Sequence, residues 1–123
     1  MAAKRIGDDA GRAAVASALA GDTVRETTAT AVRYLLQLLA ERAEGNTVEV
    51  RVPPFGAVQA IQGPRHTRGT PPNVIETDAA TWLQLATGSL TWADAVDAGR
   101  VSASGQRAHL GEHLPIAWET MEG

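Results

Sequence analysis

The residues whose types and spacing best suit chemistry are two histidines late in the chain. His109, Glu112 and His113 match the H-x-x-E-H pattern of inverted zinc peptidases. That chemistry needs a helix that brings both histidines to one face. Gly111 interrupts the motif, and the alternation of polar and apolar residues over 107–110 predicts a strand instead. Histidines four residues apart on a strand lie about 13 Å apart, so we expect two solvated imidazoles and no metal site.

The second candidate is a loop between residues 63 and 72, which is rich in glycine and proline. It holds the only concentrated group of positive or switchable side chains in the sequence, namely Arg65, His66 and Arg68. A loop of this kind, with free backbone N–H groups, is suited to binding a phosphate or a carboxylate. The alternative is a solvated hairpin whose arginines pair with Glu76 or Asp78.

Other reactive constellations are missing from the sequence. The chain has no cysteine, which excludes disulfides, thiolate metal sites and cysteine nucleophiles. No serine stands in a nucleophile-elbow pattern, and neither a phosphate-binding P-loop nor a dinucleotide fingerprint is present. We therefore predict a protein that is not an enzyme and needs no cofactor. An enzyme that uses the basic loop on an anionic substrate is the least favoured alternative.

Composition limits the architecture and the partners. The 123 residues, 44% of them hydrophobic and 20% charged, suit one globular domain. The net charge of −3 gives no basic field for nucleic acid or anionic lipid. No stretch approaches about 18 consecutive apolar residues, so we expect no membrane-spanning segment. Asp8, Asp9 and Arg12 interrupt the N-terminal region, and the apolar run over 13–20 is mostly alanine, which argues against a signal peptide and favours a cytoplasmic location.

Two helices are predicted before the first strand. Asp8 and Asp9 precede a short helical segment that Gly21 ends. A longer helix follows over 23–43, because five apolar residues recur at helical spacing and form one stripe for burial: Val32, Leu35, Leu36, Leu39 and Ala43.

The periodicity then changes to that of strands. Alternation predicts strands over 48–52, 57–62 and 74–77, then over 101–104 and 107–110. Two short helices lie between the third and fourth strands, one ended by Gly88 and one by Gly99. This order predicts an α+β fold with a five-stranded, mainly antiparallel sheet.

The spacing of small residues over 77–110 resembles that of the sterol carrier protein family. A helix that starts near Asp78 is followed by the turn Gly88-Ser-Leu90, and Ala95, Gly99 and Gly105 come at intervals of seven, four and six residues. Segments 48–59 and 63–74 are similar to the small bacterial branch of this family, found in actinobacteria. The resemblance covers about residues 32–115.

This resemblance implies helices over a five-stranded sheet, an apolar tunnel between the layers and no catalytic residue. We expect one domain over residues 1–123, with a helical extension at 1–22 and a short tail at 116–123, that carries a lipid or acyl-type ligand. The tryptophans Trp82 and Trp92 either line the tunnel or fill the core. The expected tunnel residues are Leu36, Leu39, Val50, Ile61, Trp82, Leu85 and Leu90.

A second interpretation is an accessory domain that acts beside an enzyme, similar to the C-terminal domain of thiol-dependent maleylpyruvate isomerases. The expected partner is a hydrophobic small molecule in the first interpretation and a protein in the second. The sequence leaves a homodimer open in both.

Overall fold

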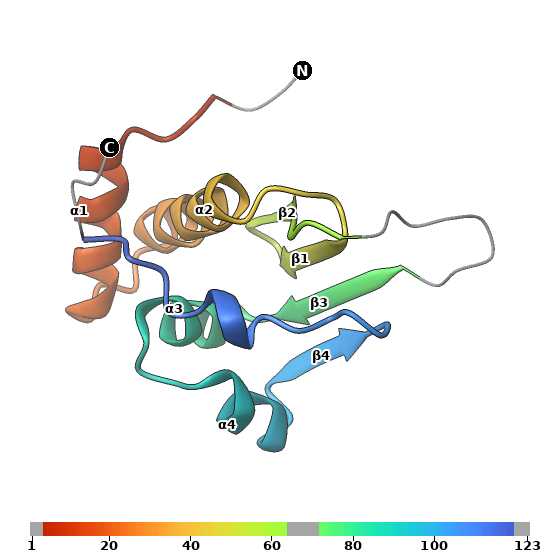
Figure 1. The fold of residues 1–123 in the computed structure, drawn as a ribbon. Helices are drawn as coiled ribbons and strands as arrows, with labels where there is room; N and C mark the ends of the chain where they lie inside the picture. The colour runs from red at the N-terminus through yellow and green to blue at the C-terminus, as the bar shows by residue number, and fades with distance from the viewer. Residues whose placement is uncertain (1–3, 64–71, 120–123) are drawn as a thin grey trace.

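The longest helix is the centre of the computed structural model, which describes residues 4–63 and 72–119. This helix, α2 (Arg25–Arg42), buries four of the five predicted stripe residues together with Tyr34 and Leu38, while Ala43 follows the helix as its C-cap and is only partly buried. The first helix, α1 (Asp8–Leu19), packs against one side of α2, and the sheet lies on the other (Figure 1). Gly11 and Val15 are the buried residues of α1.

Four strands form one sheet in the described part of the chain: β1 (Val48–Val52), β2 (Gly56–Ala60), β3 (Asn73–Thr77) and β4 (Val101–Ser104). Their order across the sheet is β2-β1-β3-β4. The pairs β1–β2 and β3–β4 are antiparallel, and the central pair β1–β3 is parallel. The sheet is therefore mixed.

The expectation of a five-stranded, mainly antiparallel sheet is wrong in two respects. First, residues 107–110 are irregular rather than a strand, because two of their backbone N–H groups are used elsewhere: Arg107 donates to the side chain of Asn73 at 2.9 Å, and His109 donates to the Arg107 carbonyl at 2.9 Å. Second, β3 pairs with β1 on the side away from β2 and runs in the same direction as β1, so the central pairing is parallel.

Two further helices connect β3 to β4. These are α3 (Ala79–Thr87) and α4 (Trp92–Asp97), and their N-terminal N–H groups are capped by the side chains of Asp78 and Thr91. Gly88 ends α3 in the left-handed conformation with φ of 93°, as its position predicts. After β4 comes a single 3-10 turn, η1 (Gly111–His113).

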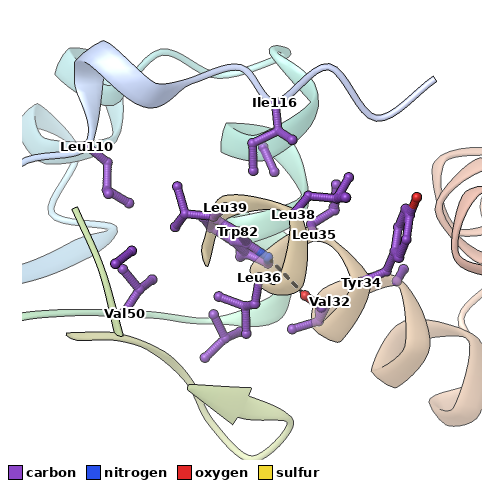
Figure 2. Close-up of a cluster of buried hydrophobic side chains, with 14 of the residues drawn as sticks. Val32, Tyr34, Leu35, Leu36, Leu38, Leu39, Val50, Trp82, Leu110 and Ile116 are labelled. Carbon is purple, nitrogen blue, oxygen red and sulfur yellow. Dashed lines mark hydrogen bonds between the residues drawn. The ribbon is translucent and has the colours of Figure 1, made fainter. Parts of the chain in front are cut away.

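One apolar cluster fills the space between the helices and one face of the sheet (Figure 2). It reaches from Val15 of α1 through α2 to Ile116 near the end of the described chain. Trp82 is fully buried in it and donates a hydrogen bond from Nε1 to the Val32 carbonyl at 3.3 Å. In residues 4–63 and 72–119, every buried polar side-chain atom has a hydrogen-bond partner, so the core presents no unpaired polar group to a ligand.

The opposite face of the sheet is polar. Arg51, Gln59 and Glu76 are exposed and alternate with more buried residues of their strands, and Ser102 of β4 is exposed as well. None of the helices described is both long and apolar enough to cross a membrane.

Candidate ligand-binding groove

A groove of about 650 Å³ opens beside α2, at the outer margin of the core cluster. Small-molecule sites in proteins usually have volumes of about 300–1,000 Å³. Three segments that are distant in sequence form its walls: one face of α2, the turn of the β1–β2 hairpin with the first residues of β2, and the chain that precedes α1. Its apolar lining comes mainly from Ile6, Leu36, Phe55 and Val58.

The α2 wall follows from helical spacing. Thr30, Arg33, Gln37 and Glu41 succeed one another at intervals of three or four residues, so they share one face of the helix. Leu36 lies beside this row and is only 1% exposed. The wall is therefore polar along the helix and apolar at its base.

We name residues 4–7 the N-terminal strap, and its residues 4–6 form a second wall. The side-chain amide of Gln37 binds the backbone of Ile6 in both directions, since Oε1 accepts from the Ile6 N–H at 2.8 Å and Nε2 donates to the Ile6 carbonyl at 2.9 Å. Arg5 adds an ion pair with Glu41, with distances of 2.5 Å from Nε to Oε2 and 2.9 Å from Nη2 to Oε1. The strap is thus attached to α2 through two side chains, those of Gln37 and Glu41, which lie about one helical turn apart.

Charged side chains at the junction of the strap and α1 support this attachment. Arg5 also contacts the Asp8 carboxylate at 3.1 Å, and the Tyr34 hydroxyl donates to the same oxygen at 2.8 Å. The Tyr34 hydrogen bond, and after it the Arg5 contact, lower the pKa of Asp8. Burial and the bond to Asp8 raise the pKa of Tyr34. Asp8 therefore stays ionised and Tyr34 stays neutral near neutral pH.

The hairpin wall is fixed by arginines. Arg33 donates from Nε to the Phe55 carbonyl at 2.6 Å, which ties α2 to the turn of the hairpin. The guanidinium of Arg25 lies 5.2 Å from the centre of the Phe55 ring, within the range of a cation–π contact. Phe55 itself is partly buried against the core cluster.

The seven expected tunnel residues lie in different surroundings within the described structure. Leu36 lines the groove, while Leu39 lines a second hollow of about 290 Å³ between α2 and residues 112–117. Val50, Trp82 and Leu85 are at most 1% exposed, and Ile61 and Leu90 are partly buried. Neither hollow is lined by any of these five residues.

The other two candidates have different outcomes. Arg65, His66 and Arg68 lie outside the described residues. His109 packs its ring against Trp92, with ring centres 5.6 Å apart, and its Nδ1 accepts from the Gly111 N–H at 3.2 Å. His113 ends the 3-10 turn η1. Among residues 4–63 and 72–119 no group of three or more potential ligands is arranged to hold a metal ion.

Most residues of the groove lie outside the sites that the sequence predicts, and only Leu36 belongs to one of them. Arg33, Gln37 and Glu41 fall largely outside the apolar stripe that predicts the buried side of the helix, and Phe55 directly follows Pro53 and Pro54 in a turn. The one available signal was the row of residues at 30, 33, 37 and 41, which combines a helical spacing with long polar side chains. Nothing local in the sequence indicates that the strap completes the site.

Comparison with known proteins adds the family. A family model described as the bacterial SCP ortholog matches residues 24–116, from the start of α2 to the last core residue, Ile116. No curated protein matches the chain. The match includes the α2 and hairpin walls of the groove, whereas the strap and α1 precede it. Since the match covers most of the chain, the protein belongs to the bacterial branch of the sterol carrier protein family.

Proposed function

We propose that the protein binds and carries an apolar, lipid- or acyl-type ligand in the groove between α2, the β1–β2 hairpin and the N-terminal strap. The observation that carries this proposal is the apolar base of the groove, formed by Ile6, Leu36, Phe55 and Val58 within a volume of about 650 Å³. The family is a carrier type, and carriage requires no catalytic residue.

Affinity in such a groove would come from removing the ligand's apolar surface from water, at about 25 cal/mol per Å² before the cost of immobilisation. The core cluster is a poorer location, because its residues pack against one another and its polar atoms are already paired. A ligand there would have to displace Trp82 or its neighbours. The groove requires no such displacement.

Titration of the full chain with decanol, followed through backbone amide NMR shifts, tests the proposal. We expect saturable shifts at residues 30–37 and 55–58. Thr30→Trp places a large ring in the groove and is expected to abolish these shifts, whereas Glu26→Trp, exposed on the same helix and outside the lining, is expected to keep them.

A finer substitution measures how closely the ligand approaches the base. A Cβ added at Gly56 would lie 3.6 Å from Leu36 Cδ1 and 3.7 Å from Arg33 Cγ, which are ordinary contacts. Gly56→Ala should therefore fold normally and weaken decanol binding. Decanol shifts that persist unchanged in both Thr30→Trp and Gly56→Ala would contradict the proposed site.

A further inference from the structure

Two cations at the groove have no carboxylate partner in the described part of the chain. Arg5 is neutralised by Glu41, but neither Lys4 nor Arg33 forms an ion pair with any residue in 4–63 or 72–119. The chain as a whole has a net charge of −3, so this local positive charge is opposite to that of the molecule.

The position of Arg33 is fixed, while most of its donors are unused. Its Nε bond to the Phe55 carbonyl holds the guanidinium over the turn of the hairpin. The four N–H groups on its two terminal nitrogens have no acceptor among the described residues. A guanidinium with two such nitrogens suits an anion that has two oxygens.

Arg33 also adjoins the apolar base of the groove. It precedes Leu36 by three residues on α2, and both side chains approach Gly56 from the helix side. A ligand whose chain lies on Leu36 and Val58 therefore passes within reach of a cation at one end. This juxtaposition of an apolar base and an unpaired guanidinium is complementary to an amphiphile with an anionic end.

Resting on the proposed function, we propose that Arg33 makes the groove selective for acyl chains that end in a carboxylate over neutral chains of the same length, with Lys4 as a second, weaker cationic contact. Arg33 binds the carboxylate through its terminal nitrogens while Nε keeps the hairpin in place. Because the side chain of Arg33 is exposed, the preference is modest, about two- to fivefold, as for other exposed ion pairs.

Calorimetric titration of the full chain with decanoate and with decanol, both below the micellar range, tests this inference. The readout is the ratio of the two dissociation constants. We expect the unaltered protein to bind decanoate about two- to fivefold more tightly, and this preference to shrink as salt rises from about 0.01 M to 1 M. Arg33→Met, which keeps an apolar stem, should remove the preference.

Matched variants separate charge at this position from charge in general. Arg107 is exposed and has no ion pair in the described chain, so Arg107→Met makes the same change in net charge and should keep the preference. Arg33→Lys should keep part of it. A ratio that is unchanged in Arg33→Met, even where both affinities fall because the hairpin has moved, would overturn the inference.

The two proposals fail in different ways. If neither decanol nor decanoate binds, the proposed carrier function fails. If decanol binds and decanoate binds no more tightly, the groove remains the site and the role of Arg33 is refuted.

Discussion

Substituting Gly11 by alanine tests how closely α1 packs against Tyr34 of α2. A Cβ at this position would lie 2.2 Å from Cδ1, 2.3 Å from Cγ and 2.5 Å from Cε1 of Tyr34. Carbon atoms in contact are normally about 3.5–4.0 Å apart, so the ring or the helix has to move by more than about 1 Å. Tyr34 is 1% exposed and bonded to Asp8, so its ring has little room to move.

The expected destabilisation combines two opposing effects. Alanine in place of glycine inside a helix stabilises by about 1 kcal/mol, whereas overpacking a buried contact costs about 1–3 kcal/mol. Because the overlap involves the part of the ring nearest the backbone, we expect the larger cost. Gly11→Ala should lower the free energy of unfolding by about 1–2 kcal/mol, measured by urea denaturation.

Two comparisons make this prediction specific. Gly7→Ala, four residues earlier, adds a Cβ that meets nothing within 4 Å, and should be neutral or slightly stabilising. In a Tyr34→Ala background the overlap is gone, so Gly11→Ala should become stabilising by about 1 kcal/mol. A Gly11→Ala protein as stable as the parent, or the same change in both backgrounds, would refute the reasoning.

Three further predictions concern single contacts. Asp78→Asn keeps an oxygen for the Thr81 N–H but removes the carboxylate whose pKa that bond lowers. The free energy of unfolding at neutral pH should change little. Its loss below about pH 4 should become shallower, since a carboxylate with a lowered pKa stabilises the fold only above that range. An equally steep acid loss in thermal melts would count against it. Gln37→Ala removes both bonds to Ile6, so hydrogen exchange at the Ile6 amide should accelerate while exchange in the core does not; an unchanged rate would show that Gln37 does not hold the strap. Trp82→Phe leaves a cavity and loses the bond to Val32, and should destabilise by about 1–3 kcal/mol in urea denaturation; a loss below about 0.5 kcal/mol would indicate a loosely packed core.

Hydrophobic periodicity is sufficient to predict the helices and strands that bury one face. Four of the five predicted stripe residues are buried in α2, and the strand predicted over 48–52 coincides with β1. Residues 107–110 show where the same signal fails. Leu110 is fully buried and Ala108 partly so, because an irregular segment that packs on the core also alternates.

Strand direction and the groove required information that is not local. Alternation in β1 and β3 gives the buried face of each strand but not whether the two run parallel. The groove joins residues 4–6, 30–41 and 55–58, and its polar wall has the same composition as a solvated helix face. Its residues acquire a common role only when the strap folds back onto α2.

The contacts of a bound chain test the central claim most directly. Isotope-filtered NOE spectra of the labelled protein with unlabelled decanol should show intermolecular contacts to Leu36, Phe55 and Val58, and none to Val50 or the indole of Trp82. Contacts to Val50 and Trp82 would place the ligand between the helices and the sheet, and would contradict the groove as the binding site.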